Sequence, residues 1–163
     1  MANVWFLGDL HAGHKNVHRF RTQFASEEEH FLKMKENFHK VVGKRDKVFF
    51  MGDTAFTLER LKDISTWVCD SKVLIAGNHD LDSLDMKTVV QYYDEVYSFY
   101  RYKEFWLSHC PIHPDELRGK RNIHGHVHHQ SLGDDRYFNA SLENTAYFPV
   151  DLNYIRKTFG EDE

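Results

Sequence analysis

The first half of the chain alternates short apolar runs with longer amphipathic segments. The apolar runs are short enough to be buried β-strands, and they cover residues 3–7, 47–51 and 72–76. The helix candidates between and after them are residues 26–43, residues 58–68 and a short segment after Asp82 or Ser83. The first helix opens on the capping pattern Ser26-Glu27-Glu28-Glu29 and ends at Gly43. This half therefore predicts a β-α-β-α-β order.

The second half is richer in aromatic and β-branched residues. Its strand candidates are residues 96–102, 105–109, 121–125 and 136–140. Lys103-Glu104 between the first two predicts an antiparallel hairpin, and Asp151 would cap a final helix over residues 151–159. Together the halves predict an α/β fold with mixed sheets covered by helices. A length of 163 residues without repeats or linkers predicts a single domain over residues 1–163.

Composition narrows the class of protein. The net charge of -4 argues against a broad basic surface for nucleic acid, so a nucleic-acid partner is not favoured. No apolar stretch approaches the ~20 residues of a membrane-spanning helix, so we expect no membrane partner. The N-terminus lacks a signal-peptide pattern, and the two cysteines do not make a disulfide framework. We therefore expect a cytoplasmic protein with reduced thiols.

Polar residues follow all three strands predicted in the first half. The strands end in Gly8-Asp9, in Gly52-Asp53 and in Gly77-Asn78-His79-Asp80. A single Asp in such a place is typical of a helix cap. Three at matching positions favour a ligand site, because the carboxyl ends of parallel strands form the binding crevice of open α/β folds.

Histidine is the unusual component, with twelve in the chain. His109 follows a predicted strand, and His126-Val127-His128 places two imidazoles on one side of an extended segment. The candidate metal donors are Asp9, His11, Asp53, Asn78, His109, His126 and His128. Seven donors suit two ions, and imidazole with carboxylate selects Mn, Fe, Zn, Co or Ni over Mg or Ca. Two such ions about 3.5–4 Å apart are typical of phosphoryl transfer.

The same motifs, in this order, resemble those of the calcineurin-like metallophosphoesterase superfamily, in particular its small cap-less members from bacteria and phages. The resemblance covers nearly the whole chain and includes Gly13-His14 after the first motif. It implies an αββα four-layer sandwich with two mixed β-sheets. It also implies how the donors divide: one ion held by Asp9, His11 and His128, the other by Asn78, His109 and His126, with Asp53 bridging.

The resemblance further implies the chemistry. His79 would protonate the leaving group as general acid, and Asp80 would orient that region. The protein would be a dimetal-dependent phosphoesterase that cleaves phosphomonoesters or phosphodiesters by in-line attack of a metal-bridging hydroxide. A small nucleotide-like substrate is expected, with Mn as the first candidate metal. The motif Gly52-Asp53 lacks the continuation found in phosphoprotein phosphatases. The short length leaves no capping domain, which predicts an open site.

Other residues are candidates for substrate contact. His14, Asn16 and His113 are the predicted substrate-binding residues. The roles of His124 and of the basic cluster at residues 118–121 stay open. We expect the remaining histidines to lie at the protein surface: His18, His30, His39 and His129. Two alternative functions also stay open: a nuclease acting on DNA or RNA, and a non-catalytic metal-binding protein on the same fold. The substrate, the preference for monoester or diester and the oligomeric state are not set by the sequence.

Overall fold

The computed structural model describes residues 1–160, and its helices and strands follow the predicted order closely. The first half of the chain forms β1 (Val4–Leu7), α1 (Val17–Phe20), α2 (Glu27–Val41), β2 (Lys47–Phe50), α3 (Leu58–Ser65), β3 (Ser71–Ile75) and α4 (Met86–Val89). The second half forms β4 (Glu95–Tyr97), β5 (Phe99–Tyr102), β6 (Phe105–Ser108), β7 (Arg121–His124), β8 (Tyr137–Asn139), β9 (Val150–Asp151) and α5 (Leu152–Thr158). Three short 3-10 turns complete it: η1 (Val90–Tyr92), η2 (Pro114–Glu116) and η3 (Leu142–Asn144).

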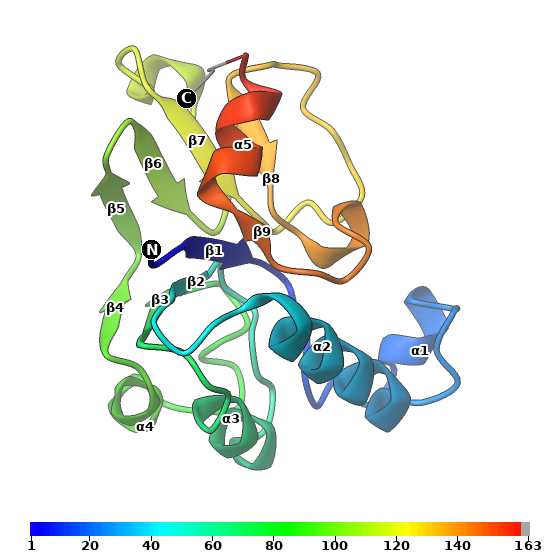
Figure 1. Ribbon diagram of the computed structural model, residues 1–163. Helices are drawn as coiled ribbons and strands as arrows, with labels where there is room; N and C mark the ends of the chain where they lie inside the picture. The colour runs from blue at the N-terminus through cyan, green and yellow to red at the C-terminus, as the bar shows by residue number, and fades with distance from the viewer. Residues whose placement is uncertain (161–163) are drawn as a thin grey trace.

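The strands form two mixed sheets. The first has the order β4-β3-β2-β1-β9, in which β1 to β4 are parallel and β9 is antiparallel. The second has the order β5-β6-β7-β8, with β5 antiparallel to β6 and the other pairs parallel. Figure 1 shows the first sheet across the middle of the molecule, with α2 and α3 below it and the second sheet above. The expected α/β fold with two mixed sheets is confirmed.

Alternating side chains divide the core into two layers. In β2 and the residue after it, Val48 and Phe50 pack against the helices, whereas Phe49 and Met51 point into the space between the sheets. The period of two arises because successive strand residues face opposite sides. Both faces of the first sheet are therefore buried, which explains why its strands read as continuous apolar runs. The second sheet contributes Phe105, Leu107 and Ile123 to the layer between the sheets.

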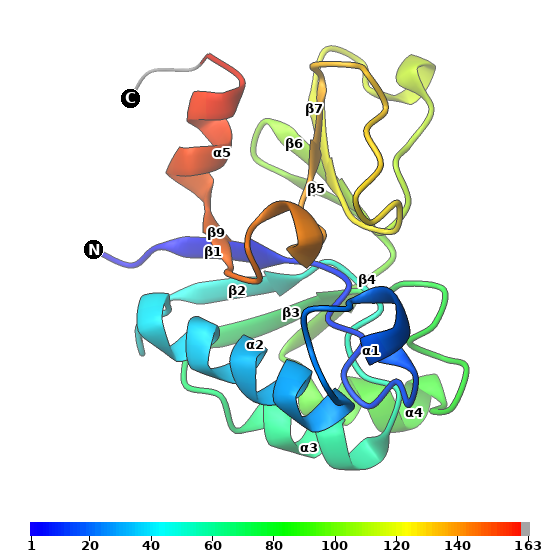
Figure 2. The same cartoon turned by 90° about the vertical axis from the view of Figure 1, so that its right-hand side faces the viewer.

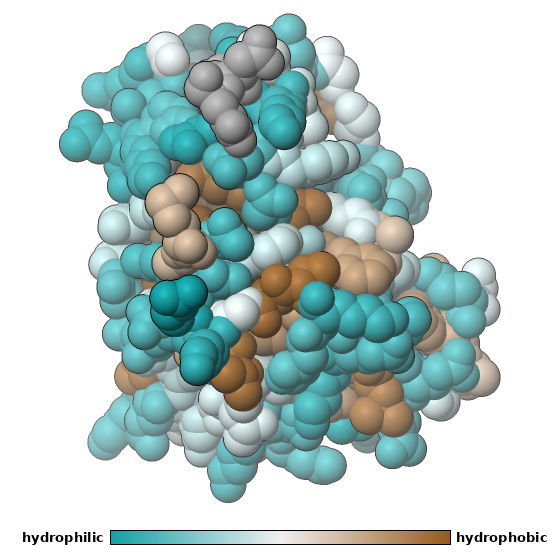
Figure 3. Space-filling view, viewed as in Figure 1, coloured by the Kyte–Doolittle hydropathy of each residue, from teal (hydrophilic) through white to brown (hydrophobic). Residues whose placement is uncertain are grey.

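The remaining elements close the sandwich. Figure 2 shows α5 on the side of the first sheet opposite α2 and α3, beside the second sheet. Its Ile155 joins the core between the sheets. The outer face of the second sheet is covered by the segment 110–120, where Leu117 O accepts a hydrogen bond from Trp106 Nε1 at 3.1 Å. Hydrophilic residues predominate on the surface in Figure 3, with apolar residues showing near the middle. Within residues 1–160 no helix is long and apolar enough to cross a membrane.

One predicted strand is wrong in its extent. Residues 96–102 do not form a single strand, because the chain leaves the first sheet after Tyr97 and enters the second at Phe99. The aromatic run is continuous in sequence, but its hydrogen-bonding partner changes from β3 to β6. Ser98 is thus the point where the chain passes from one sheet to the other. The hairpin predicted at Lys103-Glu104 is confirmed between β5 and β6.

Candidate metal centre

The centre lies where β1, β2 and β3 end. The three strands are in parallel register, with Leu7 opposite Phe50 and Phe50 opposite Leu74. The residues that follow them therefore emerge at one edge of the sheet. Backbone bonds continue beyond the strands, since the N–H of Asp9 donates to Gly52 O at 3.1 Å and that of His11 to Asp53 O at 2.9 Å. The connections after β6 and β7 bring histidines from the second sheet to the same edge.

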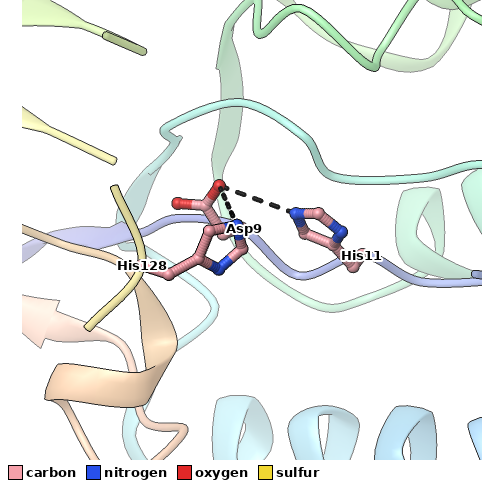
Figure 4. Close-up of side chains that lie close together, drawn as sticks. All are labelled: Asp9, His11 and His128. Atoms are coloured by element: carbon pink, nitrogen blue, oxygen red, sulfur yellow. Dashed lines mark ion pairs between the residues drawn. The ribbon is translucent and has the colours of Figure 1, made fainter. Parts of the chain in front are cut away.

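Six of the seven predicted donors gather there in two groups that could hold metal ions. The groups are Asp9 with His11 and His128, and Asp53 with His109 and His126. Within each group the candidate ligand atoms lie within 4.8 Å of one another. Figure 4 shows the first group, in which both imidazoles face the same carboxylate oxygen. Asp9 Oδ1 lies 3.7 Å from His11 Nε2 and 4.0 Å from His128 Nε2.

The two groups adjoin through their carboxylates. Asp53 Oδ2 lies 3.1 Å from His109 Nε2 in its own group and 3.8 Å from His11 Nε2 in the other. Asp9 Oδ1 in turn lies 4.0 Å from His109 Nε2. Asp53 therefore stands between the groups, the place that a shared carboxylate ligand needs.

The polar atoms at the centre fit a bound cation. Asp9 Oδ1, His109 Nε2 and both ring nitrogens of His11 are buried without a hydrogen-bond partner. Buried polar atoms are almost always satisfied, since an unpaired one costs roughly 1–3 kcal/mol. Carboxylate oxygens and imidazole nitrogens are the ligands that divalent transition metals prefer. The donor set therefore suits two such ions.

Neighbouring groups orient the ligands. Asp9 Oδ2 accepts from Ser141 Oγ at 2.6 Å and from the N–H of His126 at 2.9 Å, which leaves Oδ1 facing the centre. His109 Nδ1 donates to Met51 O at 2.7 Å. His128 Nδ1 donates to a carboxylate oxygen of Glu143 at 2.8 Å. In both histidines Nε2 is thereby fixed as the atom that can bind metal.

The side chain of Arg21 connects several of the residues that position the metal ligands. Its guanidinium is buried and bonds to Glu143 Oε1, with Nε at 2.9 Å. It also donates to the backbone oxygens of Asp9 and, at 3.2 Å, of Leu10. Nη1 lies 2.8 Å from His30 Nε2, which accepts from it. Arg21 thus joins the turn that carries Asp9 to the carboxylate that holds His128.

The electrostatics favour ionised carboxylates. Burial alone would raise the pKa of Asp9, but the neighbouring His11 imidazole and the hydrogen bond from Ser141 hold it well below its usual range. The bond to Glu143 raises the pKa of His128. Burial opposes protonation of His109, yet the carboxylate of Asp53 raises its pKa overall. Both shifts favour protonation of these imidazoles, and a metal ion would compete with those protons for the ring nitrogens.

Backbone conformation also marks the site. Nine non-glycine residues among the 160 described have positive φ, and five belong to the two groups: Asp9, His11, Asp53, His126 and His128. Such angles cost roughly 1–3 kcal/mol each and persist where surrounding contacts impose them. Gly52, with φ +95°, is required as glycine because a Cβ there would lie 2.7 Å from His109 Cγ. The turn after β2 is shaped to let His109 reach Asp53.

The expected ligand Asn78 and the residues after it line the turn beyond β3. Asn78 is exposed, and the N–H of its neighbour His79 donates to Asp53 Oδ1 at 2.8 Å. Asp80 is buried and accepts from the N–H groups of Gly77, Asp53 and Thr54 at 2.6–2.9 Å. Burial raises the pKa of Asp80. The Asp80 carboxylate therefore fixes the backbone of the second motif.

The side chain of His79 is held by Asp82 and not by Asp80, the residue expected to orient this region. Its Nδ1 contacts the carboxylate of Asp82, three residues along the chain. The His79 ring lies 6.0 Å from the ring of His11, between centroids, and its side chain is 42% exposed. With Nδ1 held, Nε2 is the atom available for proton transfer.

A cavity of about 550 Å³ opens over the two groups. It is lined by His11, His14, Phe20, His79, His126, Val127, His128, His129, Gln130 and Glu143. Of the predicted substrate-binding residues, His14 is among them. Asn16 is exposed at the start of α1, and His113 caps η2 with its side chain 71% exposed. Neither lines the cavity, because each lies on a connection that turns its side chain to solvent.

One further histidine lies elsewhere than the sequence predicts, and another adds a side chain to the cavity. His30 is not at the surface but fully buried on α2, where it accepts from Arg21. His129 is exposed as expected, yet it lines the cavity. The open question about His124 is answered by its burial and by its Nδ1, which donates to Gly125 O at 2.9 Å. In the basic cluster, Arg118 pairs with Glu116 and does not line the cavity.

Sequence analysis missed four supporting residues: Arg21, Asp82, Ser141 and Glu143. They carry no motif, and Arg21 is separated from Glu143 by 122 positions. Only Asp82 could have been found from the local sequence, because it is an acidic residue three positions after His79 and so within reach of the imidazole.

Comparisons with known proteins support the fold and name no activity. No family model matches the chain. Gene 66 protein of Mycobacterium phage L5 is 38% identical over an alignment of 85 positions that covers 49% of this chain and 41% of that protein. Gene 66 protein of phage D29 is 38% identical over 84 residues, with the same coverage. The chain thus matches less than half the length of these phage relatives.

Two further proteins match over nearly the full length. An uncharacterized protein of Methanocaldococcus jannaschii is 27% identical over an alignment of 169 positions that covers 96% of this chain and 91% of that protein. The crystal structure of a protein of unknown function from Aquifex aeolicus has a TM-score of 0.77 at 25% identity. It covers 96% of this chain and 99% of that one. The whole architecture is therefore shared with a solved structure.

Proposed function

We propose that this protein is a dimetal-dependent phosphoesterase that hydrolyses phosphomonoesters or phosphodiesters, as its resemblance to the calcineurin-like metallophosphoesterases implies. The observation that carries the proposal is the position of Asp53, whose Oδ2 lies within 3.8 Å of an imidazole nitrogen in each group of donors. A shared carboxylate is what two closely spaced ions require. We propose Mn as the metal, with Fe, Zn, Ni or Co as alternatives.

The residues around the centre suit this reaction. Two bound ions would supply the nucleophile and the positive charge that the transferring phosphoryl group needs. Asp9 and Asp53 would hold them, with His11 and His128 on one side and His109 and His126 on the other. The amide oxygen of Asn78 would join the second set from the turn beyond β3.

His79 is the proposed general acid. It lines the cavity, and Asp82 holds its Nδ1. Nε2 would then carry the proton to the ester oxygen as the bond to phosphorus breaks. Asp80 is a positioning residue in this scheme, because its carboxylate binds the backbone that places Asp53 and His79.

The proposed substrate is a small, nucleotide-like phosphate ester in the cytoplasm. The cavity of about 550 Å³ is of the size that small molecules occupy. Cys69 and Cys110 are both free thiols, which agrees with a reducing compartment.

Hydrolysis of aryl phosphates tests the proposal. Purified protein with excess Mn²⁺ should cleave p-nitrophenyl phosphate or its bis-ester, and chelation should stop the reaction. With phenyl phosphate, whose leaving oxygen needs a proton, the His79→Ala variant should lose about 10²–10⁴-fold in kcat while binding the same amount of Mn²⁺. His39→Ala, which changes an exposed histidine on α2, is the matched control.

Two outcomes would contradict the proposal. Protein with two bound Mn²⁺ ions and no turnover on any aryl phosphate would leave a non-catalytic metal-binding protein as the better description. Efficient digestion of labelled single-stranded DNA or RNA without turnover of small esters would instead identify a nuclease.

A further inference from the structure

An exposed aromatic side chain stands at the mouth of the cavity. Phe20 ends the short helix α1 and lines the cavity, although 51% of its surface is exposed. Its ring meets that of His14 in a T-shaped contact, with centroids 5.2 Å apart. Single exposed apolar side chains are common on protein surfaces, and what makes Phe20 a candidate ligand contact is its place in the lining of the cavity beside the metal-binding groups.

A wall of flat rings leads inward from Phe20. The ring of His14 lies 5.2 Å from that of Phe56, and Phe56 lies 5.1 Å from His11, between centroids. His14 Nδ1 accepts from the N–H of Asn16 at 3.2 Å. The proton of a neutral imidazole then lies on Nε2, which can donate to a ligand.

This wall begins at the metal-binding groups. The ring of His11 lies 6.2 Å from that of Phe20, while its Nε2 lies 3.7 Å from Asp9 Oδ1. A phosphoryl group held at the centre would therefore have its esterified group close to Phe20. That group would meet rings and the apolar Val127 as well as polar side chains.

We propose that the cavity selects phosphate esters whose esterified group is, or carries, a flat aromatic ring that packs against Phe20 and accepts a hydrogen bond from His14. The inference rests on the proposed phosphoesterase function and adds the substrate class and the residues that recognise it. A short or strongly polar esterified group would leave the face of Phe20 in water. An aromatic group would cover it and gain the contact energy of ring pairs.

The chain provides a matched control for Phe20. Phe99 on β5 is 49% exposed, but its ring stacks on Trp106 with centroids 4.7 Å apart, and it does not line the cavity. Replacing either side chain by alanine removes a similar exposed ring. A difference between the two variants therefore reports on the cavity and not on surface hydrophobicity.

Steady-state kinetics with Mn²⁺-loaded protein give the first test. The substrates are p-nitrophenyl phosphate, a nucleoside monophosphate and glycerol phosphate. Phe20→Ala should raise KM about tenfold for the aromatic esters and leave KM for glycerol phosphate unchanged. Phe99→Ala should leave all three unchanged. Equal effects of Phe20→Ala on every ester would overturn the proposal. The first two substrates show whether a simple aryl ring or a nucleobase is preferred.

Binding measurements separate this inference from the catalytic one. Phenylphosphonate and methylphosphonate resemble the two kinds of ester and are not hydrolysed. In calorimetry, Mn²⁺-loaded protein should bind phenylphosphonate about tenfold more tightly, and Phe20→Ala should abolish the difference. Preference for phenylphosphonate without turnover of any ester would refute the phosphoesterase function alone. Equal binding of both phosphonates by the unaltered protein would refute aromatic selection.

Discussion

Glu143 holds His128 by a single hydrogen bond of 2.8 Å, and that bond turns the far nitrogen of the ring toward Asp9. A carboxylate behind a metal-binding imidazole fixes its tautomer and raises its basicity. Glu143 is itself held by the buried Arg21, so His128 is supported by two residues and not one.

Glu143→Gln should therefore weaken Mn²⁺ binding to the group of Asp9, His11 and His128. An effect of about tenfold is expected, since supporting residues behind metal ligands contribute 10- to 100-fold in affinity. Titration of metal-free protein should show one weakened site and one unchanged site. Glu104→Gln, which alters a carboxylate paired with Arg156 far from the centre, should bind like the unaltered protein. Two unchanged sites in Glu143→Gln would refute the positioning role.

Asp53→Asn should reduce the number of bound Mn²⁺ ions from two to at most one. The amide has one oxygen and no charge, so it cannot serve both groups as the carboxylate can. Equilibrium dialysis followed by elemental analysis measures the stoichiometry. Asp134→Asn, which changes a half-buried carboxylate paired with Arg136 outside the two groups, is the control. Full occupancy of two ions in Asp53→Asn would argue against a shared ligand.

Two glycine variants separate backbone strain from crowding. Gly133 and Gly52 both have positive φ, but a Cβ at Gly133 meets nothing within 4 Å. Gly133→Ala should cost only the strain, about 1 kcal/mol of unfolding free energy. Gly52→Ala should cost at least about 1 kcal/mol more and also weaken Mn²⁺ binding, because the added carbon displaces His109. Urea unfolding measures both, and equal losses would contradict the crowding argument.

The buried His30 makes stability depend on pH. Burial and the nearby Arg21 lower the pKa of His30 to about 3, from 6.5. The unfolded chain therefore takes up a proton below about pH 6.5 that the folded protein refuses, and stability is lost as pH falls from there toward 3.

Between about pH 7 and pH 5 this contribution amounts to about 2 kcal/mol. His30→Gln keeps an acceptor for Arg21 but does not titrate, so its unfolding free energy should fall about 2 kcal/mol less over that range. Urea unfolding of metal-free protein at both pH values measures the difference. His39→Gln on the same helix is the exposed control. Parallel losses in His30→Gln and the unaltered protein would show that His30 is not the titrating group.

Much of the fold could be predicted because the pattern of the chain agrees with its packing. β1, β2 and β3 are apolar on both faces, so each appears as an unbroken apolar run followed by glycine and a polar residue. The same feature located Asp9, Asp53 and Asn78, since a strand end fixes where its next residue lies. Five positions in the two groups have positive φ. Asp and His adopt that conformation more often than most residues, but the preference is too weak to single out these positions from sequence.

What could not be predicted depends on contacts distant in sequence. Helix α1 is four residues long and has no capping side chain, so its pattern is too short to recognise. The passage between sheets at Ser98 depends on which neighbour each strand finds. His30 did carry a signal, because it precedes Met34 by four residues and shares its buried face. A general expectation that histidine is exposed gave the wrong answer there.

The route of the chain through Ser98 has a consequence for assembly of the centre. The carboxylates come from the first sheet and three imidazoles from the connections of the second, so neither sheet alone holds a complete set of donors. The donors become neighbours only after the sheets have docked. A bound ion would bind the state in which the sheets are packed together and not the separated one. It would therefore stabilise the packing of the two sheets. Metal content would then govern how long the two halves stay together as well as what chemistry they perform.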